Sequence, residues 1–362
     1  MAELFSQLDF RRGPPGRNRF MLAPLTNLQS HDDGRLSDEE LHWLEMRAEG
    51  GFAITTSCAA YVNANGRGFA GQLGISGEHH ADGLARLASA LHRSGSLALV
   101  QLYHGGMRAP AELTGSQPVS ASDDAETGAR ALATMEVEAI EEDFVQAALR
   151  AERAGFDGVE LHGAHGYLLC QFLSPSLNRR EDRYGGSLEN RSRLLTNIIA
   201  GIRERCGPDF LLGARLSPER FGMRVAEIRE LAAGLMQGGK VDFLDLSLWD
   251  VFKEPEEQEF KGRSLMSCFT ELERGGARLG VAGKIDGGPA ARHCLDAGAD
   301  FVIVGRAAIL HHDFPERVRA DPDFQAVALP VTAEYLRDEG LSPPFIQYMR
   351  NWKGFVAEDP AA

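Results

Sequence analysis

Residues 279–306, LGVAGKIDGGPAARHCLDAGADFVIVGR, contain one full repeat of the pattern that decides the fold. Two apolar runs, at 279–284 and 301–304, flank a helical pattern at 289–297, and Gly298 follows that helix. Apolar runs without polar alternation are typical of strands that are buried on both faces. A glycine just after the last helical residue is a common helix stop. The stretch therefore predicts a strand, a helix and a second strand.

The rest of the chain repeats this pattern. Further apolar runs lie at 19–25 (RFMLAPL), 52–58 (FAITTSC), 97–102 (LALVQL), 158–162 (GVELH), 210–216 (FLLGARL) and 241–246 (VDFLDL). Helical patterns occupy 37–49, 78–94, 138–154, 188–206, 226–237, 269–275 and 315–319. The first of them opens with a capping box, Ser37-x-x-Glu40. Such alternation allows a barrel or a doubly wound sheet, and eight units favour a single (β/α)8 TIM barrel of the α/β class.

Two segments interrupt the alternation. Residues 105–134 are rich in Gly, Pro, Ser and Thr, which is typical of a lid or hairpin inserted after the third strand. Residues 326–362 form a tail with two helical stretches. We therefore expect one barrel domain over 1–325 and a C-terminal tail over 326–362.

Composition narrows the class of partner. The chain has 38 Lys and Arg against 52 Asp and Glu, a formal charge of −14, which disfavours nucleic acid or an anionic membrane as the main partner. The start, MAELFSQLDF, lacks the features of a signal peptide, and no long apolar stretch predicts a membrane span. Five scattered cysteines argue against a disulfide framework, a zinc knuckle or an iron–sulfur cluster. We expect a cytoplasmic protein that acts on a small molecule.

Polar residues occur at the predicted carboxyl ends of the strands, where barrels carry their chemistry. Gln101 and Arg215 lie inside apolar runs, LVQLY and GARLS, and a buried Gln or Arg is costly unless it is paired. Both are therefore expected to serve a polar ligand. The last two loops, GVAGKID and IVGRAAI, place Gly283, Gly305 and Arg306 where barrels bind phosphate.

A G-x-G-x-x-G match at 66–71 is not a dinucleotide-binding motif. That motif requires its glycines to lie between a strand and a helix. Here small and polar residues precede the glycines, and QLGIS rather than a helical pattern follows them. The segment is expected to be a loop.

The block at 160–193 carries His162, His165 and Tyr167 within six residues. An H-x-x-H pair can bind zinc or iron, but no third ligand is evident, so no metal site is predicted. A structural histidine beside surface residues is another reading, and three such groups at one strand end argue against it. The third reading is a cluster of donors that polarises a substrate carbonyl and then delivers a proton.

The chain resembles the old yellow enzyme family of NAD(P)H:flavin oxidoreductases from about residue 4 to residue 320. Four stretches carry the resemblance: NRFMLAPLT (18–26), QLYHGG (101–106), HGAHGYLLCQFLSPSLNRREDRYGGSLENRSR (162–193) and VGRAAI (304–309). The resemblance implies a (β/α)8 barrel that holds FMN noncovalently and uses NADH or NADPH as reductant. It implies reduction of the activated C=C bond of α,β-unsaturated carbonyl or related electron-poor compounds.

The resemblance also implies a role for each matching position. His162 and His165 would bind the substrate oxygen, and Tyr167 would be the proton donor. The flavin ring would be lined by Pro24, Leu25, Thr26 and Ala59. Its pyrimidine edge would bond Gln101 and Arg215, and its phosphate would bind Gly283, Lys284, Gly305 and Arg306. We also expect substrate contacts from Trp249 and from Leu28, which stands where relatives often have an aromatic residue.

The tail sequence QYMRNWKGF (347–355) is similar to that of one subclass, in which an arginine enters the active site of a neighbouring subunit. Arg350 would be that residue in a homo-oligomer, a dimer or tetramer, and a surface arginine is the alternative. Two alternative functions remain: a flavin dehydrogenase or reductase of the same group with a different substrate, and a catalytically weak FMN-binding protein.

Overall fold

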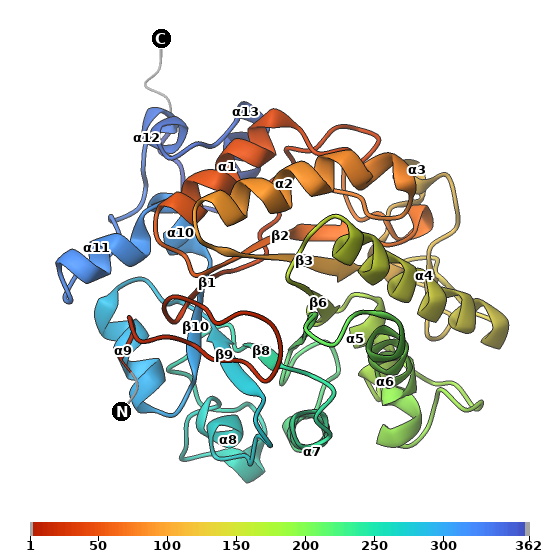
Figure 1. Cartoon of the computed structure of the whole chain (residues 1–362). Helices are drawn as coiled ribbons and strands as arrows, with labels where there is room; N and C mark the ends of the chain where they lie inside the picture. Colours follow the sequence, from red (N-terminus) through yellow and green to blue (C-terminus); the bar gives the residue numbers. More distant parts are fainter. Residues whose placement is uncertain (1–2, 359–362) are drawn as a thin grey trace.

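The structure, a computed structural model, describes residues 3–358 and contains a closed parallel barrel (Figure 1). The strands run around the barrel in the order β1-β10-β9-β8-β7-β6-β3-β2. Their bounds are β1 Phe20–Leu22, β2 Ile54–Tyr61, β3 Leu97–Tyr103, β6 Gly158–Gly163, β7 Leu211–Leu216, β8 Phe243–Ser247, β9 Arg278–Ala282 and β10 Phe301–Val304. Every run predicted as a strand is a strand, and pairing of β1 with both β2 and β10 closes the sheet. The doubly wound alternative is therefore wrong.

Helices surround the barrel (Figure 1). Those expected from the sequence are α1 Asp38–Glu49, α2 Ala81–Arg93, α4 Thr134–Arg153, α6 Leu188–Arg205, α7 Val225–Gln237, α8 Ser267–Thr270, α9 Gly288–Asp296 and α11 Phe314–Ala320. The Ser37 side chain caps α1 by accepting from the Glu40 backbone N–H at 3.0 Å. Outside the insertion, two short helices were not expected, α5 Leu168–Leu173 and α10 Arg306–Leu310. All six residues of α5 are buried, so its sequence lacks the polar face that marks a helix.

The barrel interior is apolar at the bottom. A cluster separate from the main core takes alternate residues of the strands, among them Leu99, Phe243 and Phe301. The rings of Phe243 and Phe301 lie 6.0 Å apart between centroids, and they occupy space that side chains at 213 and 280 would need. Gly213 and Gly280 therefore let two phenyl rings fill the barrel. Side chains alternate between the inside and the outside of the barrel along each strand. The next inward-facing residue of each strand therefore lies two positions further on, closer to the strand's carboxyl end.

The insertion and the tail lie outside the alternation, as expected. The insertion contains the 3-10 turn η3 Gly106–Arg108, the helix α3 Ala111–Thr114 and two short strands, β4 Val119–Ser120 and β5 Arg130–Ala131. The two strands pair in parallel, which differs from the antiparallel pairing of a simple hairpin. The tail forms α12 Ala333–Asp338 and α13 Pro343–Arg350. Within the described part of the chain, no helix has the length and apolar character needed to cross a membrane.

Candidate active site

A layer of buried polar side chains lies directly above the apolar plug. Gln101 on β3 is in register with Glu160 on β6, and its Nε2 donates to Glu160 Oε2 at 2.6 Å. Arg215 on β7 is in register with Asp245 on β8, and its Nε lies 2.9 Å from Asp245 Oδ2. All four residues are buried. The predicted polar residues Gln101 and Arg215 thus share one layer with two carboxylates that we did not predict to be functional.

Burial dominates the electrostatics of this layer. Burial and, after it, the neighbouring Asp245 raise the pKa of Glu160 to about 8, and Arg215 opposes both. Burial also raises the pKa of Asp245, again against the attraction of Arg215. One guanidinium therefore faces two carboxyl groups in a site where carrying two negative charges is costly.

Several polar atoms in this layer lack a hydrogen-bond partner. Glu160 Oε1 and Asp245 Oδ1 have none, and the 2.9 Å contact between Arg215 Nε and Asp245 Oδ2 is an ion pair without hydrogen-bond geometry. A buried polar atom without a partner costs about 1–3 kcal/mol, so such a concentration points to a ligand with polar edges. The layer therefore offers buried polar atoms that a ligand with polar edges could satisfy, and binding there stays a prediction.

His162, His165 and Tyr167 converge at the end of β6. The ring centroids of His162 and Tyr167 are 5.0 Å apart, as are those of His162 and His165. Tyr103 packs against Tyr167 with centroids 4.5 Å apart. The three residues that the sequence grouped are therefore close enough to contact one small ligand.

A chain of hydrogen bonds links the two histidines to Ser247 at the end of β8. His162 Nδ1 accepts from the Ala164 backbone N–H at 3.4 Å, and its Nε2 lies 3.3 Å from His165 Nδ1. His165 Nε2 in turn lies 2.7 Å from Ser247 Oγ. Since His162 Nδ1 accepts, its Nε2 carries the proton and donates toward His165.

Both imidazoles are neutral at physiological pH. Burial lowers the pKa of His162 and that of His165 well below their usual range, and the positive charges of Arg215 and Arg108 lower both further. Neutral imidazole offers one N–H donor per ring. The described residues contain no group of three His, Cys, Asp or Glu that could hold a metal, so the histidine pair gains no third ligand.

Two contacts from other parts of the chain fix the backbone of His165. Its φ is 61°, in the left-handed region that a non-glycine residue rarely adopts. Its N–H donates to Ser217 Oγ at 3.1 Å, beyond β7. Its carbonyl accepts from Arg108 Nη1 at 2.5 Å, from the insertion. These contacts hold a conformation that costs of order 1–3 kcal/mol.

Backbone strain of this kind gathers at one end of the barrel. Among residues 3–358, all non-glycine residues with positive φ follow the carboxyl ends of strands; they are Leu28, His165, Arg220, Phe221, Trp249 and Lys284. Strained residues cluster at functional sites because the surroundings over-determine them. The strain therefore marks the same end of the barrel as the polar layer.

The residues expected to line a flavin ring are partly exposed at this end. Pro24, Leu25 and Thr26 follow β1 and are half-buried. Ala59 on β2 packs in a cluster with Tyr61, Tyr103 and Tyr167.

Glu40 on α1 anchors the loop after β1. Its buried carboxylate accepts from Asn27 Nδ2 at 3.0 Å and from the Ser30 hydroxyl. Burial raises the pKa of this carboxyl group, and the bonds from Asn27 and Ser30 oppose that shift. Glu40 thus ties the loop that carries the half-buried residues 24–26 to the helix layer.

The residues expected to hold a phosphate differ in how closely their surroundings pack and in whether their charges are paired. A Cβ at Gly305 would meet its nearest neighbours at 3.8–3.9 Å, which is ordinary van der Waals contact, so packing does not require this glycine. A side chain at Gly283 would meet the backbone of Trp249 and Asp250 at 2.7–2.8 Å, so packing alone requires this glycine. Lys284 Nζ lies 2.8 Å from Asp250 Oδ2, whereas Arg306 is exposed.

The residues expected to contact substrate lie at three places. Leu28 is half-buried in the loop after β1. Trp249 is 55% exposed, with the Arg220 guanidinium 4.2 Å from its ring centroid. Arg350 ends α13, and its Nη1 donates to the Ala357 carbonyl at 3.4 Å. Entry of Arg350 into a neighbouring subunit stays a prediction.

His104, which follows β3, bonds residues of the neighbouring loops and not the histidine and tyrosine cluster. Its Nδ1 accepts from the Gly106 N–H at 3.0 Å, and its Nε2 lies 2.8 Å from Asn65 Oδ1. Burial lowers its pKa to about 3. This neutral ring therefore shapes the start of the insertion.

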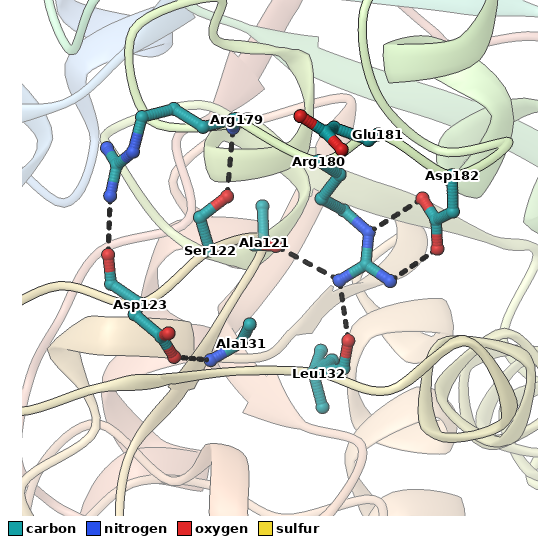
Figure 2. Close-up of a pocket in the computed structure, with 9 residues that line it drawn as sticks. All are labelled: Ala121, Ser122, Asp123, Ala131, Leu132, Arg179, Arg180, Glu181 and Asp182. Atoms are coloured by element: carbon teal, nitrogen blue, oxygen red, sulfur yellow. Dashed lines mark hydrogen bonds and ion pairs between the residues drawn. The ribbon is translucent and has the colours of Figure 1, made fainter.

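A pocket of about 450 Å³ lies between the insertion and residues 179–182, and Figure 2 shows the residues that line it. None of the predicted site residues lines it. Arg180 crosses it, pairing with Asp182 and donating to the carbonyls of Ala121 at 3.0 Å and Leu132 at 2.5 Å. Arg179 donates to the Asp123 carbonyl at 2.5 Å. We interpret this region as a clasp that fastens the insertion to the barrel.

The site fits a flavin. Its unpartnered buried oxygens of Glu160 and Asp245, its small residue at Gly305 and its neutral histidine pair suit the polar edge, the phosphate and the reacting face that such a cofactor requires.

Comparison with known proteins decides the family. A model of the NADH:flavin oxidoreductase / NADH oxidase family matches residues 3–323. The chain belongs to this family, the old yellow enzymes. It is therefore an oxidoreductase, and members of this family use FMN with NAD(P)H as reductant.

Individual relatives agree with this assignment. The chain is 33% identical to probable NADH-dependent flavin oxidoreductase YqiG from Bacillus subtilis, over 98% of this chain and 97% of that protein. It is 34% identical to an NADPH dehydrogenase from Bacillus licheniformis, over 84% and 91%. It spans only 33% of the longer NADH:acrylate oxidoreductase from Vibrio harveyi, at 33% identity. Morphinone reductase with tetrahydroNAD superposes with a TM-score of 0.78 and 30% identity, over 93% of this chain and 94% of that one.

Some residues of the site were not predicted from the sequence. Glu160 and Asp245 stand inside apolar runs, GVELH and VDFLDL, which is the signal that identified Gln101 and Arg215. Ser247 and Arg108 gave no such signal, because a serine at a strand end and an arginine in a polar loop are ordinary. Only the three-dimensional arrangement brings them to the histidine pair.

Proposed function

We propose that the chain uses NAD(P)H to reduce the activated C=C bond of α,β-unsaturated carbonyl compounds, with FMN as its bound cofactor. The observation that carries this proposal is the convergence of two neutral imidazoles and one phenol at the end of β6. Two N–H donors suit the oxygen of an enone, and a phenol suits delivery of a proton to carbon.

FMN, when bound, supplies hydride-transfer chemistry between NAD(P)H and the substrate. Gln101 and Arg215 would hold its pyrimidine edge, since they form the polar layer beneath. Pro24, Leu25, Thr26 and Ala59 would line its ring. Its phosphate would bind the loops of Gly283, Lys284, Gly305 and Arg306.

The histidine pair would stabilise the negative charge that develops on the substrate oxygen. The 3.3 Å separation of His162 Nε2 and His165 Nδ1 is long for a hydrogen bond, so a carbonyl oxygen can replace that contact at little cost. For His165 to donate as well, its proton must sit on Nδ1, which requires Ser247 Oγ to donate to Nε2. A serine hydroxyl can do this because it both donates and accepts.

Tyr167 would donate the proton to the α-carbon. Its ring is held between Tyr103 and Arg108, whose guanidinium lies 4.7 Å from the ring centroid. Leu28 and Trp249 would contact the rest of the substrate.

Stopped-flow kinetics of the FMN-loaded protein tests the proposal. We expect NADH or NADPH to bleach the flavin, and 2-cyclohexenone to restore its colour. Bleaching without reoxidation by any enone would favour a flavin dehydrogenase or reductase with another substrate. Failure of both half-reactions in a protein that binds FMN would favour a catalytically weak flavin-binding protein.

A further inference from the structure

Arg108 places a positive charge at the mouth of the histidine and tyrosine cluster. It ends η3 at the start of the insertion, and its guanidinium bonds the His165 carbonyl at 2.5 Å and lies 4.7 Å from the centre of the Tyr167 ring. Its charge reaches both imidazoles, since it lowers the pKa of each. The side chain is exposed, so further N–H donors of the fork face solvent.

The positive charge of Arg108 is not compensated by a carboxylate, whereas that of Arg215 is. Arg215 lies against Asp245 at 2.9 Å, with Glu160 in the same layer. Within the part of the chain that the structure describes, no carboxylate forms an ion pair with Arg108. The two histidines add no charge because burial keeps them neutral. Arg108 therefore carries an uncompensated positive charge beside the histidine and tyrosine cluster, in a chain whose formal charge is −14.

The position of Arg108 is fixed. Its segment begins after His104, which bonds Gly106 and Asn65, and Gln171 on α5 accepts from the Met107 N–H at 3.2 Å. The clasp of Arg179 and Arg180 fastens the rest of the insertion (Figure 2). A guanidinium held in place loses little freedom on binding an anion, and it favours the planar geometry of a carboxylate.

We propose that Arg108 selects substrates in which the activated alkene also carries a carboxylate. The oxygen of the alkene's activating carbonyl would take the histidine N–H groups, and the carboxylate would pair with Arg108. This inference rests on the proposed function and names its substrate class. The reaction is unchanged: NAD(P)H supplies the hydride, Tyr167 supplies the proton, and the carboxylate does not react.

The test compares an acid with its neutral ester. The probes are trans-4-oxopent-2-enoic acid and its methyl ester, and the proteins are the wild type and Arg108→Gln, both loaded with FMN. A charge-assisted hydrogen bond to an anion changes binding roughly 10-fold to 100-fold. Because Arg108 also holds His165 and Tyr167, we expect Arg108→Gln to lower kcat/KM for both probes, and to lower it for the acid by that further factor, through KM, so that the acid-to-ester ratio falls.

Arg319→Gln is the matched control. Arg319 on α11 is an exposed arginine whose guanidinium lies 4.2 Å from the ring centroid of Phe5, so the substitution removes the same charge and a similar stack. We expect it to leave the acid-to-ester ratio unchanged. Raising the ionic strength should reduce the wild-type preference for the acid, because an exposed charge is screened by salt.

Three outcomes would overturn the proposal. Equal loss for acid and ester would mean that Arg108 acts only by holding His165 and Tyr167. A loss confined to flavin reduction would assign Arg108 to the diphosphate of NAD(P)H. An acid-to-ester ratio that survives in Arg108→Gln would place the selection elsewhere.

A binding measurement separates this proposal from the proposed function. Oxidised FMN-loaded protein is titrated with 4-hydroxybenzoate and with 4-hydroxybenzamide, followed by the flavin spectrum. We expect the wild type to bind the acid more tightly by roughly 10-fold and Arg108→Gln to lose that difference. If no enone is reduced but this preference holds, the proposed reaction fails and the anion site stands. Equal affinities in the wild type would overturn the anion site.

Discussion

His162 and His165 are bonded to each other, with Nε2 of the first 3.3 Å from Nδ1 of the second. Because His162 donates, His165 must carry its proton on Nε2 and direct it to Ser247 Oγ at 2.7 Å. Ser247, at the end of β8, therefore sets the tautomer of His165. Strand β7 lies between β8 and β6, the strand at whose end the two histidines stand.

Ser247→Ala should release His165 from this arrangement. We expect the Nε2-protonated form to lose population in the free protein, and affinity for a carbonyl ligand to fall by about 3- to 10-fold, because the Ser247 hydroxyl can no longer donate to Nε2 and so hold the proton on Nδ1. Nitrogen-15 shifts of the His165 ring report the tautomer directly. Ser217→Ala is the control, since Ser217 bonds the His165 backbone and not its ring. Identical ring shifts in wild type and Ser247→Ala would show that Ser247 does not set the tautomer of His165.

Tyr167→Phe should slow the oxidative half-reaction. A positioned general acid contributes about 10²- to 10⁴-fold, so reoxidation by 2-cyclohexenone should fall within that range. Reduction of the flavin by NAD(P)H needs no proton from this phenol and should change little. The two half-reactions are measured separately by stopped flow. An equal loss in both would indicate that the ring of Tyr167 matters rather than its hydroxyl.

The sequence predicted the barrel because burial on both faces leaves a signature in every strand. It failed at α5 for the same reason, since LLCQFL is buried on all sides and has no polar face. Gln101 and Arg215 could be found because a polar residue inside an apolar run is conspicuous. Arg108 and Ser247 could not, because their importance comes from contacts with His165 across 57 and 82 residues of sequence.

Glu40→Ala should destabilise the loop after β1. The substitution leaves Asn27 Nδ2 and the Ser30 hydroxyl without their buried acceptor, which costs about 1–3 kcal/mol for each group. We expect a lower melting temperature and weaker FMN binding, measured by calorimetry and by flavin fluorescence. Glu40→Gln keeps one acceptor oxygen and should show a smaller effect. Wild-type FMN affinity in Glu40→Ala would show that the loop does not depend on this anchor.

Glu160→Gln should change how stability depends on pH. Burial raises the folded-state pKa of Glu160 to about 8, whereas a glutamate in the unfolded chain has a pKa near 4.5. Between these values the folded state holds a proton that the unfolded state lacks. The stabilisation is therefore complete below about pH 4.5 and is lost as pH rises through about 8, by at most about 1.4 kcal/mol per pH unit.

The amide in Glu160→Gln cannot ionise, so this part of the slope should vanish. Denaturant unfolding of wild type and variant at pH 6.0 and 8.5 measures the difference, which includes the part of the Asp245 titration that depends on the charge of Glu160. The wild type should lose more stability than the variant over this interval, because one guanidinium, Arg215, then faces two ionised carboxylates. Parallel losses in the two proteins would show that Glu160 is already ionised at pH 6.0, with Arg215 compensating both charges.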